Sequence, residues 1–339
     1  MAKRKRKKPS SNKFLTYVAW ILAVIALSLS SLVGGYYIGY EEAKNDMKIE
    51  EKAHKKKRLS MLKKLEDASS KKEKSVNTRL KDVLKKETKT YPGAATHEYE
   101  DKTLSKLPQP PKRVKRDVKK SSSKPKLAII IDDVSVRSHV NAIKSLGIPL
   151  TMSFLPPSKS RPNSAKLAAK ESIYMVHLPM EAQSFKSEEP ITLRANDSEL
   201  RITRVIQGIK KDFPRVSYIN NHTGSKFTSN ELAMNRLIYA LKSENINFID
   251  SRTTAQTKAP KVMKNFGLNY VARDVFLDHA SDKASIKRQI KKAIKIAKLH
   301  GSAIAIGHPH ENTLLALHES KKLFKDVELV YINRLYWWT

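Results

Sequence analysis

Short runs of apolar residues recur through the second half of the chain, and segments with helical spacing separate them. The runs are KLAIIID, PLTMSFLP, SIYMVHLP, VSYINNH, NFIDS, NYVARDV, SAIAIGHP and VELVYIN. Several lack the polar–apolar alternation of a half-exposed strand, which is typical of parallel strands buried on both faces. Helical patterns occur between them in SHVNAIKSLG, SAKLAAKE, ELAMNRLIYALKSE and SIKRQIKKAIKIAKLHG.

This alternation of strands and helices predicts a parallel α/β domain over residues 126–339. Seven or eight parallel strands over this length indicate a distorted (β/α) barrel, either complete or incomplete. A doubly wound open sheet is the alternative architecture.

An unbroken apolar stretch lies near the N-terminus. Residues 14–40 contain no charged residue, and about 20 apolar residues suffice for a helix to cross a bilayer. Residues 1–13 contain seven Lys and Arg residues, whereas Glu41 and Glu42 follow the stretch. The positive-inside rule therefore predicts a cytoplasmic basic tail at 1–13, a single inner-membrane anchor at 14–40 and export of the rest to the periplasm. A cleaved signal peptide is the alternative, although its apolar core is usually only about 7–15 residues long.

Residues 41–125 are rich in Lys, Glu and Ser, and their second half is interrupted by Pro and Gly. Such a composition cannot bury enough apolar surface to offset the entropy of the chain. We predict a flexible linker here, in part a loose helical stalk, between the membrane and the folded domain.

The composition limits which metal ligands and which partners the chain can have. The chain has no cysteine, so any metal must be held by His, Asp or Glu. Of the formal net charge of +33, residues 1–126 carry +20. A basic arm can bind nucleic acid, but these stretches have no interleaved aromatic residues and no recognisable DNA- or RNA-binding motif. We expect a solvated spacer and no nucleic-acid partner.

Polar residues that could act as metal ligands, acids or bases lie where the predicted strands end. In a parallel barrel the C-terminal strand ends meet at one face, where active sites lie. We therefore expect the following residues to become neighbours: Asp132, Asp133, His177, Asn221, His222, Asp250, Arg273, Asp274 and His308.

The adjacent carboxylates Asp132 and Asp133 repel each other unless a proton or a cation is near. A divalent metal would remove this repulsion, with one Asp as ligand and the other free as a base. Neutral His177 and His222 would complete a three-ligand set with an open position for water. His308 would then protonate the leaving group of a hydrolytic reaction.

Several blocks together resemble the divergent branch of the polysaccharide deacetylase superfamily, over nearly all of residues 126–335. They are AIIIDDV, LTMSFLPPS, VHLPMEA, INNHTGSKFTS, FIDSRTT, ARDVFLDH and AIAIGHPHENT. The resemblance implies a distorted (β/α) barrel that uses a divalent metal, usually zinc, to remove acetyl groups from polysaccharides such as peptidoglycan.

The resemblance also implies roles for particular residues. Asp132 corresponds to the base, Asp133 to a metal ligand and His308 to the general acid. Typical members carry two metal-binding histidines on one segment, whereas INNHTGSKF contains only His222. The metal set is therefore expected to come from two strands, with His177 as the other histidine, or to be incomplete.

The remaining strand-end residues have two interpretations. They either bind the substrate or form a hydrogen-bonded layer that orients the ligands; they are Asn220, Asn221, Asp250, Arg252, Arg273 and Asp274. Two functions fit the whole chain. One is a membrane-anchored, metal-dependent hydrolase that removes acyl groups from an envelope glycan such as peptidoglycan. The other is a catalytically inactive module of the same fold that binds a glycan or a protein partner.

Overall fold

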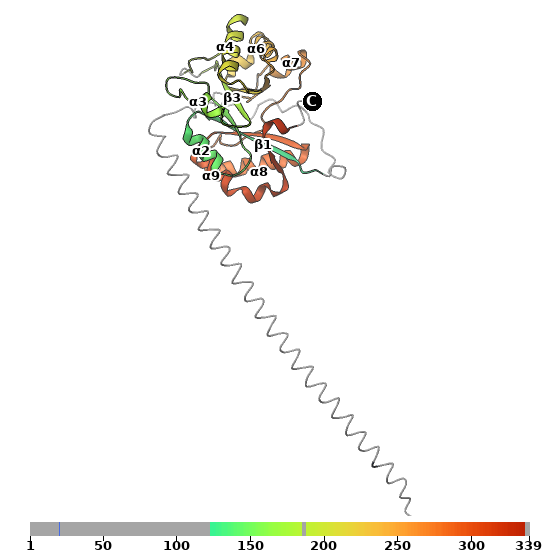
Figure 1. Cartoon of the computed structure of the whole chain (residues 1–339). Helices are drawn as coiled ribbons and strands as arrows, with labels where there is room; N and C mark the ends of the chain where they lie inside the picture. Colours follow the sequence, from blue (N-terminus) through green and yellow to red (C-terminus); the bar gives the residue numbers. More distant parts are fainter. Residues whose placement is uncertain (1–19, 21–122, 185–187, 336–339) are drawn as a thin grey trace, which may run out of the picture. The chain divides into compact units, whose positions relative to one another are not determined.

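The computed structural model describes residue 20, residues 123–184 and residues 188–335 (Figure 1). The predicted basic tail at 1–13, the anchor at 14–40 apart from Trp20, and the linker at 41–125 apart from its last three residues lie outside this part. Within it, no helix combines the length and the apolar character needed to cross a membrane.

The described residues contain eight strands in one parallel sheet. The strands are β1 (Lys126–Val134), β2 (Thr151–Phe154), β3 (Tyr174–Met180), β4 (Tyr218–Thr223), β5 (Asn247–Ile249), β6 (Val275–Phe276), β7 (Ser302–Gly307) and β8 (Glu328–Val330). Each overlaps one of the eight apolar runs of the sequence, although β6 shares only Val275 with the run NYVARDV. The prediction of a parallel α/β domain with seven or eight strands is therefore confirmed.

The sheet curls into part of a barrel. Its strand order is β5-β4-β3-β2-β1-β7-β6, and β8 pairs with the first residues of β1. From β1 to β5 each strand is added next to the one before it. The chain then forms β6 at the opposite edge of the sheet, and β7 fills the place between β6 and β1. This is the strand order of a barrel and not of a doubly wound sheet. One isolated parallel bridge, between Asp250 and Ala272, joins the β5 edge to the segment that leads into β6. The barrel is distorted because this closure is so short.

Helices cover the outer face of the sheet. They are α2 (Arg137–Ser145), α3 (Ser164–Ala168), α4 (Glu199–Asp212), α5 (Ser225–Ser229), α6 (Glu231–Ser243), α7 (Ala259–Asn265), α8 (Lys283–His300) and α9 (Glu311–Glu319). The longer ones begin at capping side chains: Ser198, Asn230 and Asp282 each accept a bond from a backbone N–H of the first turn. Helices α4, α6 and α7 lie at one end of the domain, and α2, α8 and α9 at the other (Figure 1).

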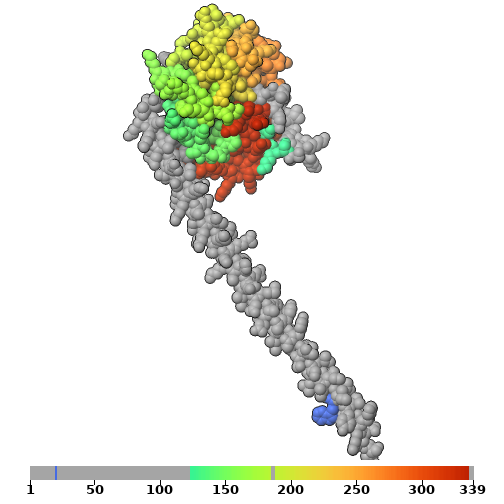
Figure 2. All heavy atoms as spheres, viewed as in Figure 1, coloured from blue at the N-terminus to red at the C-terminus, as the bar shows by residue number. Residues whose placement is uncertain are grey.

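The strands are buried on both faces, and their side chains separate into two clusters. The larger cluster lies between sheet and helices and includes Leu127, Ile129 and Ile131 of β1. The smaller one fills the inner face of the curled sheet and includes Ala128 and Ile130. In Figure 2 the blue-green start of the domain lies against its red C-terminal part, as the pairing of β1 with β7 and β8 requires. Successive residues of a strand therefore alternate between the helices and the interior.

One glycine gives a direct test of the packing beside the strand ends. Gly224, which precedes α5, has φ of 93°, and a Cβ there would lie 2.9 Å from Cβ of Met180. We expect Gly224→Ala to lower the free energy of unfolding by about 1–3 kcal/mol, because it adds backbone strain and a contact with a fixed strand atom. Urea denaturation followed by far-UV circular dichroism measures the change.

The matched control is Gly208→Ala on the exposed face of α4, where a Cβ would meet nothing within 4 Å. This control is expected to raise stability by about 0.5–1 kcal/mol, since alanine restricts the unfolded chain and favours a helix. Equal effects of the two substitutions would contradict the packing around Gly224.

Candidate metal centre and active site

The two carboxylates at the end of β1 reach one site only because the strand is irregular there. Asp132 continues the inner phase of Ile130, whereas Asp133 is out of phase and in a regular strand would face the helices. Asp133 instead has a left-handed backbone with φ of 55°, and the pairing of β1 with β2 shifts register between Ile131 and Val134. Such a conformation costs about 1–3 kcal/mol for a residue other than glycine. It turns the carboxylate of Asp133 toward His177 and His222, and Nδ1 of His177 also lies 3.6 Å from Oδ2 of Asp132.

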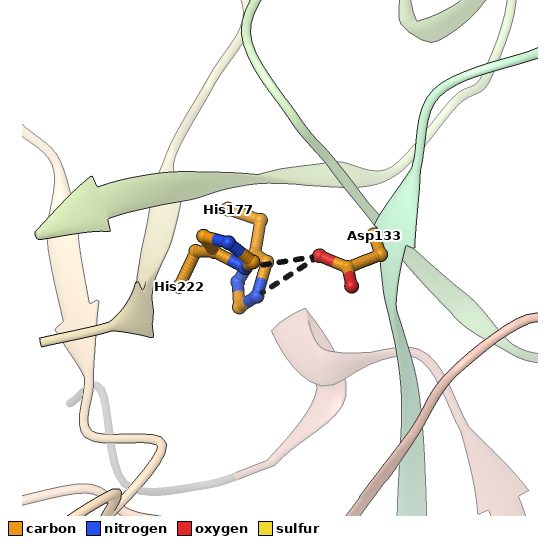
Figure 3. A group of neighbouring side chains, drawn as sticks. All are labelled: Asp133, His177 and His222. Carbon is orange, nitrogen blue, oxygen red and sulfur yellow. Dashed lines mark ion pairs between the residues drawn. The ribbon is translucent and has the colours of Figure 1, made fainter. Parts of the chain in front are cut away.

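Asp133, His177 and His222 form a compact cluster: Asp133 and His222 lie near the ends of β1 and β4, and His177 lies in the middle of β3 (Figure 3). The Oδ1 atom of Asp133 lies 3.1 Å from Nδ1 of His222 and 3.6 Å from Nε2 of His177. One donor atom from each of the three residues lies within 4.8 Å of the others, and all three side chains are buried. The structure thus brings together the three residues that the sequence suggested as metal ligands, and they come from three separate strands.

The electrostatics of this cluster fit a divalent cation. Neither carboxylate oxygen of Asp133 accepts a hydrogen bond of ordinary geometry from the described part of the chain. Burial raises the pKa of the Asp133 carboxyl, but the imidazoles of His222, His308 and His177 outweigh this effect and hold its pKa at about 2. A buried carboxylate that stays charged needs a compensating charge. Two imidazole nitrogens and a carboxylate are donors that zinc accepts, with a fourth position left for water.

Asn220 links this cluster to the second carboxylate. Its Nδ2 donates to Oδ1 and Oδ2 of Asp132 at 2.9 and 2.8 Å. Its Oδ1 accepts from Oγ of Ser153 at 2.6 Å and from Nδ1 of His177 at 3.0 Å. The proton of His177 therefore sits on Nδ1, and the lone pair on Nε2 faces Asp133. Because Asn220 is fully buried, it positions both the carboxylate and the imidazole.

His308 follows β7 and completes the site. Its Nε2 lies 4.0 Å from Oδ2 of Asp133, and its Nδ1 lies 3.1 Å from Oδ1 of Asp278. The other oxygen of Asp278 accepts from the backbone N–H of His308 at 2.6 Å and from Oγ1 of Thr313 at 2.7 Å. Burial raises the pKa of Asp278, but His308 and Thr313 outweigh it, so the pKa lies below its usual value. The Asp278 anion thus keeps a proton on Nδ1 of His308 and directs Nε2 at the site.

His139 of α2 lies beside the strained residue. Burial lowers the pKa of His139 to about 4, although Asp133 opposes the shift, so the ring is neutral at pH 7. Its electrostatic neighbours are His310 and Asp133. Asp133 is the residue with the left-handed backbone, and such conformations persist only where the surroundings hold them.

Two further predicted residues bind neighbouring loops. Asn221 donates from Nδ2 to the carbonyl of Thr223 at 2.7 Å, and its Oδ1 accepts from the backbone N–H of Ser251 at 2.9 Å. Asp250 accepts from the hydroxyl of Tyr270 at 2.9 Å. These contacts join the ends of β4 and β5 to the segment before β6.

The other three predicted residues bond to the backbone as well. The guanidinium of Arg252 donates to the carbonyl of Arg273 at 3.1 Å, and that of Arg273 donates to the carbonyl of Arg252 at 3.0 Å. Asp274 accepts from the backbone N–H of Ile304 at 2.8 Å. Contacts of this kind hold the strand ends in place around the histidines and carboxylates.

Asp278, Ser153 and His139 are site residues that the sequence analysis did not find. Asp278 lies two residues after the end of β6, in the inner phase of Phe276. The sequence pattern instead put the end of that strand at Arg273 and Asp274, several residues before Asp278. His139 has no sequence signal because it lies in the helix after β1 and not at a strand end.

Comparison with known proteins places this domain among relatives. A sequence model described as divergent polysaccharide deacetylase matches residues 129–336. The uncharacterized protein YibQ of Escherichia coli strain K12 is 36% identical over 216 residues, which cover 62% of this chain and 67% of YibQ. An uncharacterized protein of Haemophilus influenzae is 32% identical over 221 residues, which cover 64% of this chain and 78% of that protein.

The fold is shared with a solved structure. The crystal structure of an uncharacterized protein from Agrobacterium tumefaciens C58 has a TM-score of 0.55 and 19% identity, over 62% of this chain and 89% of its own. At this level of identity the match concerns the fold alone.

The amide at position 220 can be tested by an isosteric change. Asn220→Asp replaces the donor to Asp132 by a carboxyl, so two carboxylates would meet without a proton between them. We expect a loss of about 3–5 kcal/mol of unfolding free energy at pH 7. Repulsion raises the pKa of the introduced group in the folded state, so the loss should vanish as pH falls below the ordinary Asp value of about 3.9.

The matched control is Asn247→Asp at the start of β5, whose amide donates only to the carbonyl of Ser217 at 3.2 Å. It should change stability by less than about 1 kcal/mol. Denaturant unfolding between pH 3 and pH 8 compares the two variants, and equal losses would show that Asn220 does not hold Asp132.

Proposed function

The chain belongs to the divergent polysaccharide deacetylase family, and from this premise we propose that it is a metal-dependent hydrolase that removes acetyl groups from an envelope glycan such as peptidoglycan. The observation that best supports the proposal is the cluster of Asp133, His177 and His222, beside a second carboxylate and a third histidine. Such a set of groups can hydrolyse the bond between an acetyl carbon and the nitrogen or oxygen that carries it.

The side chains supply the proton transfers of such a reaction. A divalent ion held by Asp133, His177 and His222 would polarise the acetyl carbonyl and lower the pKa of water in the site. Asp132 then takes a proton from the attacking water. His308 gives its Nε2 proton to the departing nitrogen or oxygen, so that the bond to the acetyl carbon breaks and acetate leaves.

Both proton carriers are held in place before the substrate arrives. Asn220 fixes the carboxylate of Asp132 through two hydrogen bonds, and Asp278 fixes the imidazole of His308. Fixed geometry of this kind removes an entropic cost from the reaction.

We also propose that the domain works outside the cytoplasm, attached to the inner membrane by residues 14–40. The support is the sequence itself: seven basic residues, then 27 residues without a charge, then two acidic residues. An envelope glycan is accessible to the domain only on that side.

The orientation can be tested with reporters fused after Thr339. Alkaline phosphatase, which folds only after export, is expected to be active in whole cells, and a reporter active only in the cytoplasm is expected to be silent. A variant with the basic residues at 3–8 changed to serine is the control. In this variant the difference in activity between the two reporters should be much smaller. The opposite pattern of activity would place the domain inside the cell.

The assignment of base and ligand can be separated in two variants of the full-length chain. Asp132→Asn is expected to keep the metal and to lower acetate release by about 10²–10⁴-fold, because it removes the base but no ligand. His222→Gln is expected to lose both metal and activity. Elemental analysis and acetate release from N-acetylated peptidoglycan fragments measure the two effects.

His300→Gln, at the C-terminal end of α8 and outside the cluster, is the control and should behave as the wild type. A wild-type chain without stoichiometric metal would refute the proposal. A chain that holds the metal but releases no acetate would favour the inactive module instead.

A further inference from the structure

A second group of metal-binding side chains lies directly beside the first. Asp278, His308 and His310 each offer one donor atom, and these atoms lie within 4.8 Å of one another. The ring centroids of His308 and His310 are 5.6 Å apart. Asp278 and His308 are buried, and His310 is half-buried, so an ion could enter from the side of His310. The donor set, two imidazoles and a carboxylate, equals that of the first cluster.

We propose that Asp278, His308 and His310 form a second divalent-metal site of lower affinity, and that its occupation switches off the hydrolase. The effect on activity rests on the proposed function, whereas the binding of the ion does not. Imidazole and carboxylate ligands together suit zinc and similar transition ions better than magnesium or calcium.

The ion and a proton compete for one nitrogen. When His308 acts as the acid, its Nδ1 carries a proton that is shared with Oδ1 of Asp278, 3.1 Å away. An ion that binds between these atoms replaces the proton, which leaves to solvent, and both atoms then give a lone pair to the ion. A His308 ring that binds the ion through Nδ1 cannot be imidazolium, the form that gives up its Nε2 proton near neutral pH.

Existing hydrogen bonds set the order in which the two sites fill. Asp133 accepts no hydrogen bond of ordinary geometry from the described residues, so an ion that binds its carboxylate does not have to displace one. Asp278 already accepts from the backbone N–H of His308 and from Thr313. His310 precedes the first turn of α9, where the helix dipole disfavours a cation. The first site should therefore fill first, and the second only at higher metal concentration.

Calorimetric titration of the metal-free full-length chain with Zn²⁺ tests the proposal. We expect two binding events in the wild type that differ in Kd by about tenfold or more. His310→Ser should abolish only the weaker event. Serine is a favourable residue at the start of a helix, and survival of the tight event shows that the variant is folded. His222→Gln should abolish only the tight event.

An exposed histidine provides the control for adventitious zinc. His279→Gln changes the neighbour of Asp278 in the chain and should leave both events intact. A single event in the wild type, or a weaker event that survives His310→Ser, would overturn the second site.

Activity gives an independent readout. Zn²⁺ beyond the first equivalent should inhibit acetate release by the wild type in proportion to the weaker event, and should not inhibit His310→Ser. Inhibition that is equal in both proteins would overturn the switch. A chain that binds two ions as predicted but releases no acetate would refute the proposed hydrolase and still support the second site.

Discussion

The arrangement of the site depends on one break in the two-residue alternation of β1. If the strand stayed regular, the carboxylate of Asp133 would point among the apolar side chains between sheet and helices, where an unpaired charge is costly. The left-handed backbone at Asp133 avoids this, at an expense of about 1–3 kcal/mol. His139 lies beside this residue, and His177 and His222 lie against the carboxylate. Strain and a carboxylate without a hydrogen-bond partner among the described residues thus occur at one residue, which supports the proposed role of Asp133 as a metal ligand.

The two groups that we propose as proton carriers follow a common electrostatic rule. A base must remain anionic until it acts, and a hydrogen bond to the charged form favours that form. Asp132 is held by the neutral amide of Asn220, which donates to both of its oxygens. A general acid must remain protonated, and His308 is held by a carboxylate, Asp278. The neutral amide of Asn220 favours the anionic form of Asp132, and the anionic Asp278 favours the protonated form of His308. The supporting residues therefore help to set the charge that each proposed role needs.

Much of this could be predicted from the sequence because strand ends converge in a parallel barrel. The apolar runs are long enough to identify the strands, and Asp132, His177, His222 and His308 all follow the inner phase of their strands. Asp278 escaped because β6 has only two residues, too few to show a period. The turn at Asp133 could not be predicted either, since the period of a regular strand assigns that side chain to the opposite face. Which of the two carboxylates is a ligand therefore followed from family resemblance and not from spacing.

The pairing of β3 with β4 explains how two strands can replace a single segment that carries both histidines. His177 lies opposite Asn220 in this ladder, and His222 lies two residues further along β4, opposite Pro179. Both histidines are therefore on the inner face of neighbouring strands, and His222 lies two residues further along the ladder than His177. Their separation is set by backbone hydrogen bonds and by the buried amide of Asn220, not by a loop. A slip of the ladder by one residue would turn one histidine toward the helices, so the register of the sheet itself determines whether the two imidazoles can bind the same ion.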